Sequence, residues 1–212
     1  MFAVLFEVQP KSEKWDEYLG IAKMLKPELE AIDGFVENVR YRSLTRPGWL
    51  LSLSIWRDEK ALVRWRTQAV HHGAQERGRF EIFGDYHLRV GELTGTGSTE
   101  RSDETQVGAG TIATLVDGKR AVKDTASDQV AASLGLRADA PGLVAWDVFE
   151  AVLTPGDVIL LMTSRDRKTA DGLARDVSVK DDVRLRQVRI LRDYGMYDRR
   201  EAPQYYPDVA RR

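Results

Sequence analysis

The chain has 212 residues, a formal net charge of -1 and 31% charged residues, which is ordinary for a globular protein. The near-neutral charge lacks the basic footprint of nucleic-acid binding. The absence of cysteine excludes disulfides, thiol nucleophiles and thiolate metal ligands. The N-terminal apolar run is short, and no segment approaches the roughly 18 apolar residues of a membrane helix. We therefore expect a soluble, cytoplasmic protein with neither a nucleic-acid nor a membrane partner.

Six elements are expected in residues 1–92. Residues 2–8 form an apolar run ended by a proline, which predicts a buried strand, and Ser12 is a candidate N-cap for a helix that ends at Asp33-Gly34. Residues 35–44 and 49–56 predict two strands of an antiparallel hairpin around the Pro47-Gly48 turn. A second helix is expected from Asp58 to about residue 77, and a last strand over 80–90. The order is β-α-β-β-α-β, a ferredoxin-like unit.

A second unit of the same order is expected after a linker. Residues 93–108 are polar and rich in Gly, Ser and Thr, which is typical of a linker. Strands are predicted at 110–116, 143–151, 158–163 and 183–192, with helices at about 122–134 and 165–177. The expected domains are therefore 1–92, the linker 93–108, a second unit at 109–195 and a C-terminal tail at 196–212.

Turn and helix-start signals recur at one fixed spacing, which supports a duplication. Three pairs of matching signals are each separated by 108 positions. They are Gly34 and Gly142, the Pro-Gly pairs that end at 48 and 156, and the Arg-Asp pairs that start at 57 and 165. Each unit should place both helices on one face of a four-stranded sheet and leave an apolar face that needs cover. We expect the two units to cover each other within one chain, and a further homo-oligomer remains open.

The amino-acid sequence of residues 1–92 resembles that of the antibiotic biosynthesis monooxygenase (ABM) family, which belongs to the dimeric α+β barrel superfamily. The resemblance rests on FEVQP, DGF, SLTRPGWLLSLSIWRDEKALVRWR, the HxxAQxxGR-like stretch at 72–79, FGDYHLRV and the tail after residue 192. It implies an α+β fold with two ferredoxin-like units in a dimeric α+β barrel type arrangement within one chain. It also implies a monooxygenase that needs no metal or cofactor and acts on a small-molecule substrate, an aromatic or quinol-like compound.

The second helix of the first unit carries the candidate site. Trp65, Ala69 and His72 share one helical face, and Gln75 or Glu76 extends that face by a turn. In this superfamily the helix borders a pocket between helices and sheet, so Trp65, Ala69 and Gln75 are expected to bind substrate. His72 is the candidate general base because its ordinary pKa lies near 6.5. His71 is expected to face solvent because it lies about 100° away on the helix.

Glu7 is the second catalytic candidate, because a carboxylate in the middle of an apolar strand is costly unless it is paired. A structural interpretation stands beside each of these assignments. Glu7 could form an ion pair with Arg40 or Arg89 across the sheet. Trp65 could be a core residue, and His72 could hydrogen-bond nearby backbone.

Two other functions remain open from the sequence, a non-catalytic small-molecule binding or stress protein and a haem-binding or haem-degrading enzyme. The haem-degrading branch of the family places Asn, Trp and His where this chain has Glu7, Trp65 and Gln75. Haem ligation is therefore not carried over, and no metal ligand or bound cofactor is expected. At the spacing of 108, the second unit has Leu173 and Lys180 in place of Trp65 and His72. We expect the site in the first unit alone.

Overall fold

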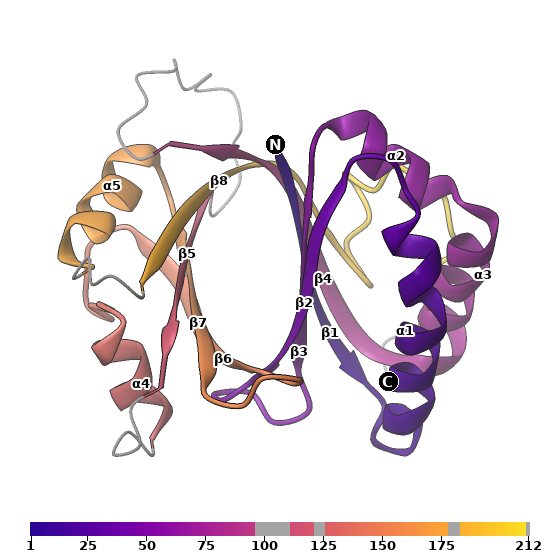
Figure 1. Cartoon of the computed structure of the whole chain (residues 1–212), viewed down its shortest axis with the longest axis horizontal. Helices are drawn as coiled ribbons and strands as arrows, with labels where there is room; N and C mark the ends of the chain where they lie inside the picture. The colour runs from indigo at the N-terminus through magenta and orange to yellow at the C-terminus, as the bar shows by residue number, and fades with distance from the viewer. Residues whose placement is uncertain (96–110, 121–125, 178–182, 211–212) are drawn as a thin grey trace. The chain divides into compact units, whose positions relative to one another are not determined.

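The computed structural model describes residues 1–95, 111–120, 126–177 and 183–210. The first repeat has the expected order (Figure 1). It consists of β1 (Phe2–Pro10), the short 3-10 turn η1 (Ser12–Lys14), α1 (Trp15–Glu30), β2 (Phe35–Ser43), β3 (Leu50–Trp56), α2 (Glu59–Thr67), α3 (Ala69–Arg77), the π-helical turn η2 (Gly78–Ile82) and β4 (Phe83–Thr94). Within the described part of the chain no helix is long and apolar enough to cross a membrane.

The second repeat follows the same order with shorter helices. It consists of β5 (Ile112–Lys119), α4 (Ser127–Ser133), β6 (Leu143–Ala151), β7 (Asp157–Ser164), α5 (Arg167–Asp176) and β8 (Arg184–Gly195). The start of the predicted 122–134 helix lies outside the described residues, as does most of the expected linker.

The paired turns of the two repeats have the same backbone conformation. Gly34 and Gly142 have φ angles of 91° and 85°, and Gly48 and Gly156 have φ angles of 81° and 94°. These values lie in the left-handed region, which glycine enters without the steric cost of a Cβ atom. The spacing of 108 in the sequence therefore corresponds to a repeated local structure.

The starts of the second helices also match. Asp58 caps α2 by accepting a hydrogen bond from the Ala61 amide, and Asp166 caps α5 by accepting one from the Thr169 amide. An aspartate at this position satisfies an amide that would lack a partner and lies at the positive end of the helix dipole. Ser12 does not have the expected role, because it begins η1 and the N-cap of α1 is Lys14.

The fold class is α+β, as expected. The strands of the described residues are hydrogen-bonded in the closed order β1-β3-β2-β6-β7-β5-β8-β4. The chain forms two compact units that are discontinuous in sequence. Unit 1 contains Met1–Val39, Gly48–Val90 and Arg192–Arg212, and unit 2 contains Arg40–Pro47 and Gly91–Leu191.

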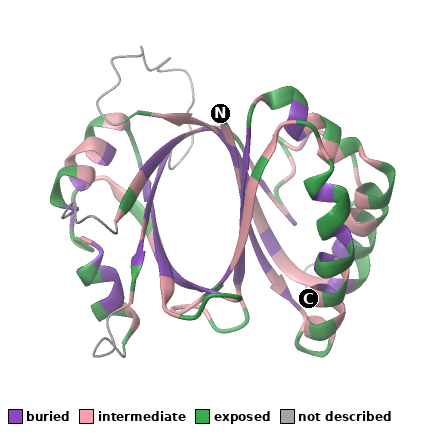
Figure 2. Ribbon diagram, in the orientation of Figure 1, coloured by how far each residue is buried: buried purple, intermediate pink, exposed green. Residues whose placement is uncertain are grey.

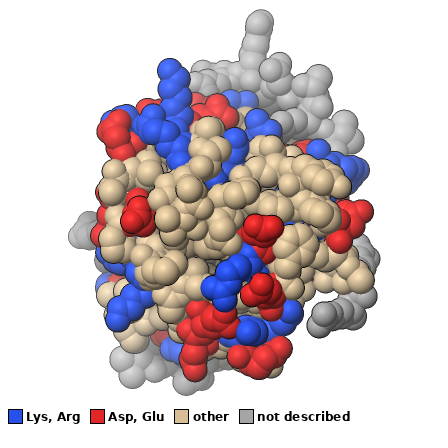
Figure 3. Space-filling view, turned by 90° about the vertical axis from the view of Figure 1, so that its right-hand side faces the viewer, with Lys and Arg blue, Asp and Glu red and all other residues tan. Residues whose placement is uncertain are grey.

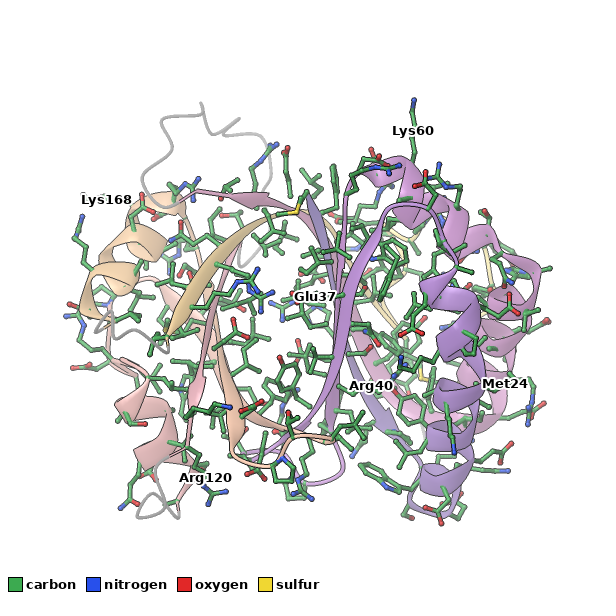
Figure 4. The ribbon with its side chains drawn as sticks, viewed as in Figure 1. Met24, Glu37, Arg40, Lys60, Arg120 and Lys168 are labelled. Atoms are coloured by element: carbon green, nitrogen blue, oxygen red, sulfur yellow. The ribbon has the colours of Figure 1, made fainter. Side chains whose placement is uncertain are left out.

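One face of the unit 1 sheet packs against its helices (Figure 2). Phe2 and Val4 of β1 pack there with Trp56 and with Leu29 of α1. Side chains alternate along a strand, so Glu7 lies on the opposite face from Val4. The outer side of α1 is exposed, as Met24 shows by pointing away from the sheet with 56% of its surface exposed (Figure 4).

The helix-facing side of unit 2 is more uniformly aliphatic. Its buried core comes from β5, β6, β7, α4 and α5 and includes Val116, Val148, Leu160, Met162 and Leu173. Leu173 is fully packed at the position that corresponds to Trp65 at the spacing of 108. This position in unit 2 therefore serves packing.

The predicted helix over 58–77 is wrong in its continuity. It is interrupted at Gln68, whose ψ angle of 131° is extended and which ends α2 and caps α3. The Gln68 side chain accepts a hydrogen bond from the His71 amide at 2.7 Å. The strand expected over 80–90 begins later, at Phe83, because η2 occupies the preceding residues. Helical spacing therefore cannot be carried from Trp65 to the residues beyond Gln68.

Candidate functional site

The interruption at Gln68 brings His71, and not His72, against Trp65. The two rings stack with centroids 3.9 Å apart and an interplanar angle of 12°. The His71 Nδ1 lies 2.9 Å from the Trp65 carbonyl oxygen. A carbonyl can only accept, so Nδ1 carries the proton and Nε2 is the acceptor nitrogen. The expectation that His71 faces solvent is wrong, because it assumed one unbroken helix.

Burial keeps His71 neutral. Desolvation lowers the pKa of His71 to about 4, against the opposing effect of its bond to the Trp65 carbonyl. A neutral imidazole stacked on an indole forms a flat wall with one acceptor nitrogen. Such a wall suits a ring-shaped or planar ligand, and its nitrogen can accept a hydrogen bond from that ligand. A ring whose pKa is lowered to about 4 holds a proton only weakly at neutral pH.

His72, Gln75 and Ala69 lie at the surface end of this region. Ala69 and His72 are exposed, so the buried stripe expected through them ends before Gln68. The C-terminal tail reaches His72, where Tyr206 stacks on the ring at a centroid distance of 5.9 Å. Its hydroxyl lies 3.3 Å from His72 Nδ1 and 3.4 Å from Gln75 Oε1. Gln75 Nε2 also lies 3.3 Å from His71 Nδ1, but both nitrogens are donors once Nδ1 carries the proton, so this contact is not a hydrogen bond.

Glu7 is not close to this group. It lies on the opposite face of the sheet, 5% exposed, where Arg89 donates a hydrogen bond of 2.5 Å to Glu7 Oε1. Arg89 was one of the two ion-pair partners expected from the sequence. The structure therefore separates the two catalytic candidates, and Glu7 and His72 cannot act on one atom of a bound molecule in this arrangement.

His87 joins the ion pair from β4. Its Nε2 lies 2.5 Å from Asp193 Oδ1, and its Nδ1 lies 3.7 Å from Glu7 Oε1. Burial disfavours the charged ring, but the hydrogen bonds to Asp193 and Glu7 outweigh it and raise the pKa of His87 to about 9. The ring is therefore a cation at neutral pH, between two carboxylates and beside Arg89.

This shift predicts a stability that falls as pH rises. Between pH 6.5 and about 9 the folded chain binds the His87 proton more tightly than the unfolded chain does. The contribution is complete below 6.5 and is lost as pH rises through 9. The side chain is 41% exposed, so screening keeps the effect modest. Urea unfolding of the wild type should show the decline, and His87→Gln should flatten it; parallel curves would contradict the assignment.

An aromatic cluster fills the helix side of unit 1 beside α1 and α3. The Phe6 ring lies 5.8 Å from Phe83 and 5.9 Å from Tyr86, and Tyr18 of α1 lies 5.9 Å from Phe83. Gly78 makes this possible, because a Cβ atom there would lie 2.4 Å from the Phe83 ring. Apolar rings of this kind form the floor of many sites that bind small organic molecules.

Arg79, for which the sequence predicts no role, lies at one side of this cluster. Arg79 is 2% exposed and donates to the Tyr86 hydroxyl at 3.2 Å and to the Met196 carbonyl at 2.8 Å. Arginine is rarely buried, so a buried arginine often marks a functional site. The burial of Arg79 depends on contacts with the C-terminal tail, and helical spacing in the sequence does not reveal it. Figure 3 shows the outer surface on this side with charges of both signs around an uncharged area.

Comparison with known proteins places these features in a family context. The family model described as antibiotic biosynthesis monooxygenase matches residues 1–77. The curated protein named jasmonate monooxygenase ABM, from Pyricularia oryzae, is 49% identical over 226 residues, an alignment that covers 99% of this chain and 100% of that protein.

A solved structure with low sequence identity supports the fold alone. An aldoxime dehydratase (OxdRE) in complex with butyraldoxime has a TM-score of 0.57 at 10% identity, covering 89% of this chain and 79% of its own. A putative monooxygenase from Lactobacillus acidophilus has a TM-score of 0.41 at 10% identity, covering 89% of this chain and 93% of its own.

Proposed function

Because the chain belongs to the antibiotic biosynthesis monooxygenase family and is a monooxygenase of the ABM type, we propose that it hydroxylates a jasmonate-like substrate. The observation that carries this is 49% identity over nearly the whole chain to a jasmonate monooxygenase. The proposal replaces the aromatic or quinol-like substrate that the family resemblance alone implied. Jasmonate is a cyclopentanone with an acetate side chain and an apolar alkenyl chain.

The helix side of unit 1 is the proposed site. Its floor of Phe6, Phe83 and Tyr86 suits an apolar ring and alkenyl chain. The stacked Trp65–His71 pair offers a flat wall with an acceptor nitrogen. The aromatic floor and the Trp65–His71 wall both belong to unit 1, so the proposed site needs no residue of unit 2.

The residues expected from the sequence take different places in this proposal. Trp65 lies in the wall, and Gln75 and His72 lie at its outer end under Tyr206. Glu7 belongs to the ion pair on the other face, and Ala69 is exposed. We therefore assign the acceptor role to His71 and keep His72 as a residue of the rim.

Hydroxylation inserts one atom of dioxygen into the substrate and consumes two electrons and two protons as the other atom leaves as water. A quinol can supply those electrons itself, whereas a jasmonate-like compound requires a reductant. The test is incubation of the full chain with jasmonate and isotopically labelled dioxygen, with and without ascorbate. We expect a product carrying one labelled oxygen by mass spectrometry, and unlabelled or unchanged jasmonate in both arms would refute the proposal.

Two substitutions in α3 test whether the reaction takes place beside His71. His71→Ala should lower kcat/KM by about tenfold or more, since it removes the wall and its acceptor nitrogen. Val70→Ala is the matched control, because this neighbouring side chain is 47% exposed. An equal loss in both variants would indicate damage to α3 and would remove His71 from the site.

A further inference from the structure

Arg79 differs from the other buried arginines of the described residues. Three arginines are buried there, and two of them lie on carboxylates. Arg89 donates to Glu7, and Arg186 donates to Asp117 at 2.8 Å. Arg79 forms no ion pair with any described carboxylate. A buried charge without a counter-ion is costly, so the positive charge of Arg79 requires an explanation.

Neutral groups hold the Arg79 guanidinium. Nη1 donates to the Tyr86 hydroxyl and the Met196 carbonyl, and Nη2 donates to the Pro207 carbonyl at 3.0 Å. Its Nε has no partner among the described residues. Several other buried arginine Nε atoms of the described residues also lack a partner, so the feature that distinguishes Arg79 is the absence of a carboxylate. The tail carbonyls accept hydrogen bonds from the Arg79 guanidinium but do not neutralise its positive charge.

A second arginine converges on the same phenol oxygen. Arg199 Nη1 donates to the Tyr86 hydroxyl at 2.5 Å, and Nη2 donates to the Gln204 carbonyl at 2.7 Å. Its guanidinium lies over the rings of Tyr194 and Tyr206, at 5.6 and 5.4 Å from their centroids. Among the described residues Arg199 also has no ion pair with a carboxylate. Two cations therefore point at one neutral oxygen.

The surrounding groups do not supply the missing negative charge. Burial raises the pKa of Tyr194 to about 12 and also raises the pKa of Tyr206, so both phenols are neutral at physiological pH. Glu76 acts electrostatically on Tyr206 but forms no ion pair with Arg79 or Arg199 in the described structure. The two guanidinium groups that meet at the Tyr86 hydroxyl therefore lack a counter-ion among the described residues, and an anionic ligand could supply one.

We propose that Arg79 and Arg199 form the subsite for the carboxylate of an apolar carboxylic acid. The inference rests on the proposed function, because it names how the jasmonate-like substrate is held. A carboxylate accepts two parallel N–H bonds from a guanidinium and is a stronger acceptor than a main-chain carbonyl. It would take over donors that the Pro207 and Gln204 carbonyls hold, while the apolar body of the acid lies on the Phe6 and Phe83 rings.

The test compares an acid with its neutral ester. For Arg79→Gln and Arg199→Gln, KM for jasmonate should rise about tenfold or more, because a charge-assisted hydrogen bond is lost. KM and kcat for methyl jasmonate should change less than about threefold, since the ester carries no charge to lose. Arg200→Gln is the matched control, because Arg200 lies next to Arg199 in the tail and its side chain is 87% exposed.

Equal changes for acid and ester would overturn the subsite, because a purely structural role affects both compounds alike. Unchanged kinetics for the acid would overturn it as well. If Arg79→Gln does not fold by circular dichroism, Arg199→Gln decides the question.

Calorimetric binding of cyclopentylacetate, compared with its neutral amide, separates this inference from the proposed function. Binding of the acid that is lost in Arg199→Gln supports the subsite even if jasmonate is not hydroxylated. Turnover of jasmonate by the wild type, with equal binding of acid and amide, leaves the function standing and removes the subsite.

Discussion

Glu7→Leu is expected to lower the free energy of unfolding by about 3–5 kcal/mol, the largest effect we expect from one side chain. The variant leaves Arg89, whose side chain is 4% exposed, without the carboxylate to which it donates. Water cannot replace that partner cheaply at such burial. Urea unfolding at neutral pH measures the loss.

A double variant separates the ion pair from the packing. Glu7→Leu combined with Arg89→Leu should recover much of the loss, because replacing both charges with apolar groups removes the uncompensated charge. Glu7→Gln should fall between the wild type and Glu7→Leu, since its amide oxygen can still accept from Arg89. Losses that simply add in the double variant would show that the two side chains do not interact.

Gly91→Ala is expected to destabilise the chain by about 3 kcal/mol, because there is no room for a side chain at this position. A Cβ atom on Gly91 would lie 2.3 Å from the main-chain oxygen of Arg189 and 2.5 Å from Val188 Cγ1. The first of these contacts is with backbone, so β4 and β8 would have to move apart within unit 2. Thermal and urea unfolding should both detect the change.

Gly20→Ala is the control for that substitution. Gly20 lies in α1, and a Cβ atom there would meet nothing within 4 Å. Alanine is the better helix former, so this variant should stabilise the chain by about 0.5–1 kcal/mol. A comparable destabilisation at both positions would mean that the clash at Gly91 is not the cause.

The turns and helix starts could be predicted from the sequence because each depends on local chemistry. Gly34 and Gly142 adopt the positive φ that an Asp-Gly or Pro-Gly turn predicts, and Asp58 and Asp166 cap the helices that follow. Such positions depend on a few neighbouring residues, so one fixed spacing was enough to recognise the duplication.

The site could be predicted only as far as the helix remained regular. Ala61 and Leu62 of α2 are buried, and Trp65, three residues further along the helix, packs against the same core. One extended residue, Gln68, then shifts the phase, so His71 turns inward and His72 turns outward. A glutamine in mid-helix is not a recognised breaker, which explains why the periodicity gave no warning.

The role of Arg79 could not be predicted because its partners are far away in the chain. Met196 and Pro207 surround a guanidinium that local patterns place at the end of a surface helix. The ion pair of Glu7 with Arg89 could be anticipated as one of two choices, because both side chains lie on strands of the first repeat.

The discontinuity of unit 1 has a consequence for how the protein is made. Arg192–Arg212 belongs to this unit, yet it leaves the ribosome only after all of Gly91–Leu191 has been synthesised. At a translation rate of about 5–20 residues per second, the first repeat waits several seconds for its last segment. During that interval Arg79 lacks the Met196 and Pro207 carbonyls, so the carboxylate subsite can be assembled only after residues 196–207 have been synthesised.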